Sequence, residues 1–237
     1  MSLDPVMGGG TAERSIQISR ALNRVGHRCT ILTTDTGLLP DYLHQLRNWG
    51  LRVVVLPSLW KRFYLPQPSQ DLINKLVASA DVVNLMSHWT LINALVYRSV
   101  TKLTKPYTVC PAGALPIFGR SRVFKILYNH LIGRQIILHA NGCIAISPNE
   151  IEQFKSCGVQ PGRVTVIPNG INPDDFSESD GKSFRARHGI GDAPLILFLG
   201  RLNIIKGPDM LLDAFCRCSR DARMKAYQLV FAGPDGG

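Results

Sequence analysis

Hydrophobic residues along the chain follow two different periods, and the segments of each kind alternate. Short apolar and β-branched runs predict strands at residues 28–34, 52–57, 81–86, 106–111, 143–147 and 164–168. Apolar residues at helical spacing predict helices at residues 11–25, 69–79, 91–103, 121–138 and 149–156. Alternating strands and helices favour an α/β fold, in which a Rossmann-like parallel sheet is covered by helices.

The first predicted helix has identifiable ends. Thr11 is its expected N-cap, and Gly26 is its expected C-terminal stop. Three glycines, at positions 8–10, lead directly into it, and such a start offers free N–H groups to an anion. An apolar strand should precede this loop, but only Val6 and Met7 stand there.

The composition changes after Pro168, where a turn-rich and acidic segment begins. A strand at 194–200, a helix at 208–218 and a strand at 229–233 then form one βαβ unit. We therefore expect an N-terminal domain over residues 1–168, a linker over 169–193 and a C-terminal domain over 194–237. A single βαβ unit cannot bury both faces of its sheet, so the second domain is expected to be truncated.

The charge predicts an anionic partner, because 27 basic residues against 17 acidic ones give a net charge of +10. No acidic residue lies between Asp81 and Glu150. That stretch carries seven cations, which are Arg98, Lys102, Lys105, Arg120, Arg122, Lys125 and Arg134. We interpret residues 121–138 as an ordinary helix that covers the sheet, and a peripheral membrane contact is the alternative.

Other features limit the class of protein. No apolar stretch reaches the ~20 residues of a membrane-spanning helix, and the N-terminus lacks the basic and apolar regions of a secretion signal. The six cysteines have neither zinc-site spacing nor the density of a disulfide framework, and the histidines lack metal-site spacing. We expect reduced thiols, no metal site and a cytoplasmic location, with the inner face of the membrane as the alternative.

The strongest chemical signal is the segment Gly200-Arg-Leu-Asn-Ile-Ile-Lys-Gly207, which lies between an apolar strand and a helix. Ligands of parallel sheets bind beyond the carboxyl ends of the strands, so this turn should face a crevice. Arg201 and Lys206 would place two cations there. Together they could stabilise the negative charge that develops on a diphosphate leaving group.

These motifs resemble those of the retaining family 4 glycosyltransferases. The resemblance covers nearly the whole chain, through the glycine loop Gly8-Gly-Gly-Thr-Ala-Glu-Arg14, Ala145-Ile-Ser-Pro-Asn-Glu150, Val166-Ile-Pro-Asn-Gly170 and Leu197-Phe-Leu-Gly-Arg-Leu-Asn-Ile-Ile-Lys-Gly207. The third and fourth pieces are specific as a pair, in this order and about thirty residues apart. The resemblance implies a GT-B fold, which consists of two facing Rossmann-like lobes.

The resemblance also implies the binding residues for a sugar donor. Arg201 and Lys206 match the pair that binds the donor diphosphate. Gly9 and Gly10 match a loop that approaches the donor and acceptor.

Two further sites are implied in the first lobe. Asn169 and Gly170 match the crossover, or hinge, between the lobes. His88 follows the third strand, where relatives often have a catalytic histidine near the reacting sugar; a packed, hydrogen-bonded histidine is the alternative.

The implied function is transfer of a hexose from a nucleotide sugar to a hydroxyl of a glycan or lipid-linked acceptor, in the synthesis of cell-surface polysaccharide or glycolipid. No cofactor, metal ion or nucleic-acid partner is implied. The sequence departs from the family in two ways: Asn84 replaces a common histidine, and the chain ends at Gly237, before two glutamates of the family that are eight positions apart. We therefore expect this fragment itself to be inactive.

Two alternatives remain at this stage. A sugar-nucleotide epimerase or a phosphorylase of the same fold would also hold phosphate between two lobes. A non-enzymatic, basic module that binds nucleic acid or other anions would account for the charge, although aromatic residues are not interleaved with the cations.

Overall fold

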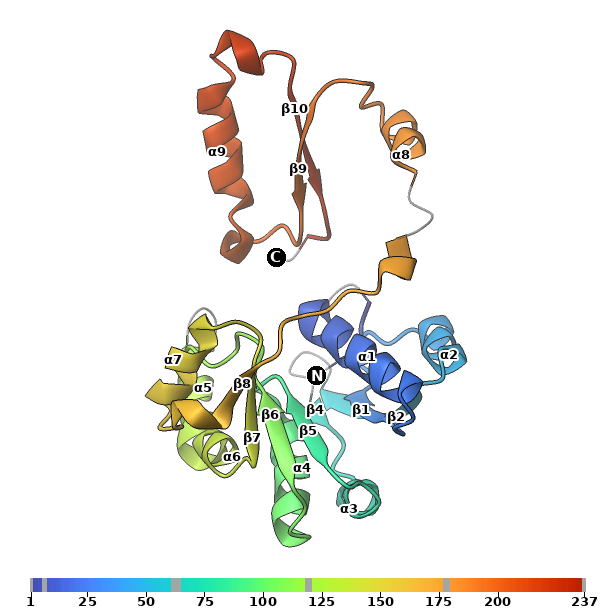
Figure 1. The fold of residues 1–237 in the computed structure, drawn as a ribbon, viewed down its shortest axis with the longest axis vertical. Helices are drawn as coiled ribbons and strands as arrows, with labels where there is room; N and C mark the ends of the chain where they lie inside the picture. Colours follow the sequence, from blue (N-terminus) through green and yellow to red (C-terminus); the bar gives the residue numbers. More distant parts are fainter. Residues whose placement is uncertain (1, 6–7, 61–64, 118–120, 177–179, 236–237) are drawn as a thin grey trace. The chain divides into compact units, whose positions relative to one another are not determined.

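The computed structural model describes residues 2–5, 8–60, 65–117, 121–176 and 180–235. The chain divides into two compact units, which we call unit 1 (Met1–Ile171) and unit 2 (Asn172–Gly237). Both contain parallel strands with helices beside them (Figure 1), which confirms the predicted α/β fold class.

Unit 1 contains two parallel sheets and a short antiparallel pair. Its strands are β1 (Thr30–Thr34), β2 (Arg52–Leu56), β3 (Ser58–Trp60), β4 (Leu65–Pro66), β5 (Val83–Met86), β6 (Tyr107–Cys110), β7 (Gly142–Ala145) and β8 (Val164–Val166). Its α-helices are α1 (Gly9–Arg24), α2 (Pro40–Asn48), α3 (Gln70–Ala78), α4 (Leu91–Lys102), α5 (Arg122–Tyr128), α6 (Arg134–Leu138) and α7 (Asn149–Ser156). A π-helical turn, η2 (Asn129–Gly133), joins α5 to α6, and a 3₁₀ turn, η3 (Pro161–Arg163), precedes β8.

Strands β5, β6, β7 and β8 form one parallel sheet in that order, and β1 pairs with β2 in the other. The antiparallel pair is β3 with β4. The segment before the glycine loop adds a parallel bridge from Ser2 to Thr34, and both Ser2 and Leu3 are buried. The N-terminal segment thus lies beside β1, although Val6 and Met7 are outside the described residues.

Two hydrophobic clusters stabilise unit 1. The larger one packs α3, α4 and α6 against the β5–β8 sheet, with Ile73, Val100, Val109 and Ile137 among its fully buried side chains. The smaller one packs α1 and α2 against β1 and β2. Burial of this apolar surface fixes the sheets from which the loops of the candidate site extend.

The structure corrects several details of the sequence prediction. The first helix begins at Gly9, so Thr11 is not the N-cap but lies in the first turn and donates from Oγ1 to the Gly8 carbonyl at 3.2 Å. The helix predicted at 121–138 contains the π-helical turn η2. Its first part, α5, buries no residue, so the expected role of covering the sheet belongs to α6.

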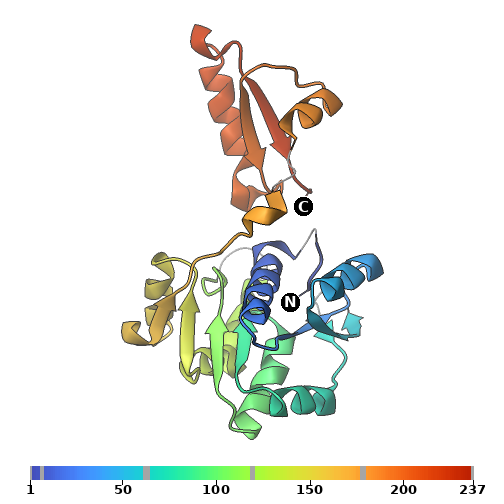
Figure 2. The ribbon, with the colours of Figure 1, turned by 45° about the vertical axis from the view of Figure 1, so that its right-hand side comes forward.

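Unit 2 consists of two parallel strands with helices beside them. The strands are β9 (Leu195–Leu199) and β10 (Gln228–Ala232), and the α-helices are α8 (Gly181–Arg187) and α9 (Pro208–Cys218). The 3₁₀ turns are η4 (Pro173–Phe176), η5 (Ile204–Lys206) and η6 (Ala222–Met224). Figure 2 shows β9 and β10 side by side, with α9 along them. Among the described residues of this unit, Ile190 is the only buried hydrophobic side chain.

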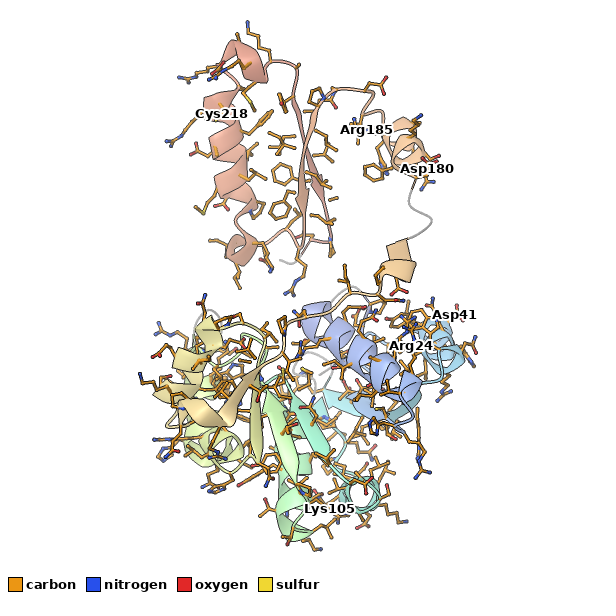
Figure 3. The ribbon with its side chains drawn as sticks, viewed as in Figure 1. Arg24, Asp41, Lys105, Asp180, Arg185 and Cys218 are labelled. Carbon is orange, nitrogen blue, oxygen red and sulfur yellow. The ribbon has the colours of Figure 1, made fainter. Side chains whose placement is uncertain are left out.

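Helix α8 lies inside the segment 169–193, which was predicted to be a linker without a helix. Its N-cap is Asp180, whose Oδ1 accepts from the amides of Lys182 and Ser183, and Arg185 donates to the carbonyls of Gly191 and Ala193 (Figure 3). Local side-chain hydrogen bonds therefore stabilise this helix.

Candidate functional site

The glycine loop forms the open start of α1. The Gly8 amide donates to the Asp4 carbonyl at 2.8 Å, and a β-carbon at Gly8 would lie 2.4 Å from that carbonyl oxygen and 2.7 Å from Ala12 Cβ. Only glycine fits this position. Gly9 has φ of +58°, and a β-carbon at Gly10 would meet no atom within 4 Å. The loop thus combines a tight turn at Gly8 with free space beside Gly10, where a ligand could approach the backbone.

His88 lies two residues after the end of β5, at the carboxyl edge of the β5–β8 sheet. The preceding residue, Ser87, has φ of +66°, and Asn93 holds this turn by donating from Nδ2 to the carbonyls of Met86 and Ser87. His88 is 2% exposed, and its Nε2 lies 2.8 Å from Asn129 Oδ1. This is the geometry of a packed and hydrogen-bonded histidine.

Aromatic rings surround the His88 imidazole. Trp89 and Tyr128 lie edge-on to it, with ring centroids at 4.5 and 5.6 Å. Burial lowers the pKa of His88 below its ordinary value of 6.5, and the hydrogen bond to Asn129 opposes that shift. His88 also lines a small hollow of about 140 Å³. Contact between His88 and a reacting sugar stays a prediction.

The partner of His88 comes from the π-helical turn. Asn129 begins η2, where the helix widens, and such turns recur at functional sites. A β-carbon at Gly133 would lie 2.6 Å from Asn129 Oδ1, so the glycine makes room for the amide. The pair Asn129 and Gly133, four residues apart, could have indicated this arrangement, but the sequence prediction did not include it.

Asn169 and Gly170, the predicted crossover residues, lie three and four residues after the end of β8, near the end of unit 1. The Oδ1 atom of Asn169 accepts a hydrogen bond from Arg14 Nη1 at 2.9 Å. Arg14 is a buried residue of α1, and the sequence prediction assigned it no role of its own. The structure thus brings Asn169 to the helix that begins at Gly9.

Arg201 and Lys206 lie in unit 2, in the turn that follows β9. The Gly200 amide donates to the Ala232 carbonyl at 3.0 Å, and the Leu202 amide donates to the Pro234 carbonyl at 2.9 Å. The Oδ1 atom of Asn203 accepts a hydrogen bond from the Lys206 amide at 3.2 Å, so Asn203 is the N-cap of η5. These bonds order the backbone of the turn at the carboxyl ends of β9 and β10.

The two cations of this turn are available for a ligand. In the described part of unit 2, no carboxylate forms an ion pair with Arg201 or Lys206. Lys206 is exposed and Arg201 is half-buried. An arginine fork and a lysine ammonium placed in this way can bind an anionic group such as a diphosphate.

Other parts of the described chain are weaker candidates for a functional site. A surface hollow of about 560 Å³ is lined by α4 between Ala94 and Lys102 and by Ile132 and Gln135, and none of the predicted site residues lines it. Among the residues that the structure describes, no three His, Cys, Asp or Glu side chains could together hold a metal ion. No described helix is long and apolar enough to cross a membrane.

Comparison with known proteins supports the sequence resemblance. The model of Glycosyltransferase Family 4 matches residues 8–175. A D-inositol 3-phosphate glycosyltransferase from Geodermatophilus obscurus is 35% identical over 89 residues, which is 37% of this chain and 20% of the relative. A D-inositol 3-phosphate glycosyltransferase 2 from Catenulispora acidiphila is 32% identical over 112 residues, 45% of this chain and 26% of the relative.

Solved structures show the same fold at lower sequence identity. The crystal structure of Anabaena Alr3699/HepE in complex with UDP and glucose matches with a TM-score of 0.70 and 18% identity. That match covers 96% of this chain and 58% of the Anabaena chain. The apo form of the lipopolysaccharide outer core galactosyltransferase WaaB matches with a TM-score of 0.54 and 15% identity, over 95% of this chain and 57% of the other. The chain thus spans less than two thirds of these neighbours.

Proposed function

Because the chain belongs to glycosyltransferase family 4, we propose that the full protein transfers a hexose from a nucleoside-diphosphate sugar to a hydroxyl acceptor. The transfer retains the anomeric configuration and serves the synthesis of a cell-surface polysaccharide or a glycolipid. The acceptor is a glycan or a lipid-linked molecule that presents this hydroxyl.

The observation that carries this proposal is the ordered turn after β9, with Arg201 and Lys206 free of carboxylate partners among the described residues. Breaking the bond between sugar and diphosphate leaves negative charge on the departing phosphate. A cation that meets this charge stabilises the transition state more than the ground state, and therefore accelerates transfer. These side chains would supply the positive charge that a metal ion supplies elsewhere, so we expect no metal requirement.

The relatives support the same chemistry. The Anabaena protein was solved with UDP-glucose, and the curated relatives are named as glycosyltransferases of D-inositol 3-phosphate. A nucleotide sugar as donor and a hydroxyl as acceptor follow from these names by analogy.

The test uses the full-length protein with UDP-, GDP- and ADP-sugars, and measures both transfer and donor hydrolysis with a chelator present. We expect turnover with one class of donor, and a product with the anomeric configuration of the donor. An epimerised sugar nucleotide or a sugar phosphate as product would instead support an epimerase or a phosphorylase. Absence of turnover with every common donor would reject the proposal.

The exposed face of α5 supports a peripheral membrane contact as part of this function. Five large apolar side chains of this region are 49–77% exposed, and they are Val123, Phe124, Ile126, Leu127 and Leu131. Arg122, Lys125 and Arg134 accompany them, without an acidic residue from position 82 to 149. Apolar side chains flanked by cations suit the anionic surface of the cytoplasmic leaflet.

Vesicle binding tests this contact. We expect the protein to sediment with vesicles that contain phosphatidylglycerol, and to bind less at high salt. The variant Phe124→Ser/Leu127→Ser should lose this binding. Val25→Ser removes an apolar side chain that is equally exposed but lies at the end of α1, so it should keep the binding. Equal binding to purely zwitterionic vesicles would contradict the role of charge.

A further inference from the structure

Arg14 connects the first helix of unit 1 to the segment through which the chain leaves that unit. Its Nη1 donates to the Pro168 carbonyl at 3.0 Å and to Asn169 Oδ1 at 2.9 Å, and its Nη2 donates to the Ile167 carbonyl at 2.8 Å. All three acceptors belong to consecutive residues after β8. One side chain therefore holds three successive residues that lie 153 to 155 positions away in the sequence.

The arrangement is specific for arginine. Arg14 is 4% exposed, and within the described residues no carboxylate forms an ion pair with it. A buried cation of this kind is tolerated only if oxygen atoms surround it. The planar guanidinium directs its donors to several acceptors at once, which the single ammonium of lysine cannot do with the same geometry.

The Arg14 guanidinium has a second neighbour in unit 1 besides the residues after β8. Burial raises the pKa of the Cys110 thiol, at the end of β6, and the nearby positive charge of Arg14 opposes that rise. The Nε atom of Arg14 is buried and has no hydrogen-bond partner among the residues that the structure describes. The hydrogen bonds to Ile167, Pro168 and Asn169, together with the contact to the Cys110 thiol, offset the burial of this charge.

The position of Arg14 joins two candidate functional segments. Helix α1 starts at Gly9, in the glycine loop that the proposed function assigns to the ligand. Ile167, Pro168 and Asn169 precede the boundary between the two units by a few residues. A shift of α1 must therefore move the crossover or break these hydrogen bonds.

We propose that Arg14 is a positioning residue for sugar transfer, because it fixes residues 167–169, which lead into the predicted crossover at Asn169 and Gly170, to the helix that carries the glycine loop. The effect on catalysis rests on the proposed function. The fixed crossover is a property of unit 1 alone and does not depend on it.

The test compares Arg14→Lys and Arg14→Gln with Arg24→Gln in the full-length protein. Arg24 is an exposed cation at the end of the same helix, so its replacement is a matched control. Hydrogen exchange of the Ile167 amide, which donates to the Ala145 carbonyl at 2.8 Å, reports on the segment that Arg14 holds, and steady-state kinetics report on catalysis. Exchange at β6 reports on the integrity of the fold.

We expect both Arg14 variants to raise exchange at the Ile167 amide by tenfold or more, with β6 unchanged. The kcat should fall at least tenfold, while the KM for the nucleotide sugar changes less than threefold, because Arg201 and Lys206 remain. Unchanged exchange in a folded Arg14→Gln protein would overturn the fixed crossover. Increased exchange with an unchanged kcat would overturn the catalytic role.

A second pair of variants keeps the test decisive if Arg14→Gln does not fold. Asn169→Ala removes one acceptor and leaves the two backbone carbonyls, so it should raise exchange by a smaller factor. In the Arg14→Lys/Asn169→Asp protein, a new ion pair should restore part of the slow exchange, and failure of this rescue would count against the proposal. If the wild-type protein shows slow exchange at the crossover but no transfer with any donor, the proposed function fails while the fixed crossover stands.

Discussion

The imidazole Nε2 of His88 lies 2.8 Å from Oδ1 of Asn129, and this contact links the end of β5 to the π-helical turn. The amide oxygen can only accept, so Nε2 carries the hydrogen of the pair. Burial lowers the pKa of His88, which keeps the ring neutral in the folded protein below the pH at which an exposed histidine would be charged.

The stability of the protein should therefore depend on His88 in mildly acidic solution. Well above pH 6.5 the ring is neutral in both states and contributes no pH dependence. Below that value the unfolded chain binds a proton that folded His88 does not, so stability falls as the pH falls, by up to about 1.4 kcal/mol per pH unit from this residue. Urea unfolding of the wild type and His88→Gln between about pH 5 and 7.5 measures the effect as the difference in slope.

The glycine loop allows stability and activity to be separated. Gly10→Ala places its methyl in open space within a helix, so we expect stability equal to the wild type or up to about 1 kcal/mol higher. If Gly10 approaches the donor, the same methyl should lower kcat/KM at least tenfold. Gly8→Ala should instead destabilise the protein, because its methyl would collide with the Asp4 carbonyl. Thermal unfolding and transfer assays of the full-length variants decide, and full activity of Gly10→Ala would argue against a close approach at that position.

Removing either cation of the turn after β9 should weaken donor binding. We expect Arg201→Ala and Lys206→Ala each to reduce UDP affinity by about 10- to 100-fold, because a charge-assisted hydrogen bond contributes about 1.5–3 kcal/mol. Isothermal calorimetry of the full-length protein measures the change. Arg223→Ala alters the net charge equally, but its guanidinium is exposed and paired with Asp221 at 2.7 Å. That control should bind UDP normally, and a comparable loss there would indicate a general effect of charge.

The free cysteines should differ widely in reactivity. Cys216 and Cys218 are exposed on α9 (Figure 3 shows Cys218), whereas Cys110 and Cys143 are buried. Burial also raises the pKa of both buried thiols, and the thiolate is the reactive form. A disulfide reagent at neutral pH should therefore modify Cys216 and Cys218 first, by a factor of at least ten in rate. Rapid modification of Cys110 would contradict its packed environment.

Most of the fold could be predicted from hydrophobic periodicity. Helices α7 and α9 have the predicted bounds, because their apolar spacing and end signals agree. The sequence prediction did not include α2 or α8, which carry few buried side chains, with Leu46 in α2 and none in α8. A short helix of this kind is determined by its cap and neighbours more than by its own pattern.

The candidate site was predictable only where a local motif carried the signal. Arg201 and Lys206 lie in one continuous turn, so their spacing was sufficient to predict that they lie close together. The contact of Arg14 with Asn169 and that of His88 with Asn129 join residues 155 and 41 positions apart. Such contacts depend on the packing of α1 and η2 against the sheets, and a single sequence does not contain that information.

The two strands of unit 2 have a consequence for how residues 1–237, when produced by themselves, behave at high concentration. In the described part of this unit, β9 and β10 pair only with each other, so each has an edge without a neighbouring strand, and Leu197 and Leu199 are exposed on β9. Unpaired edges beside exposed leucines are templates on which strands of a second molecule can add. This chain should therefore tend to self-associate as it is concentrated, and substitution of Leu199 by lysine should keep it monodisperse in light scattering.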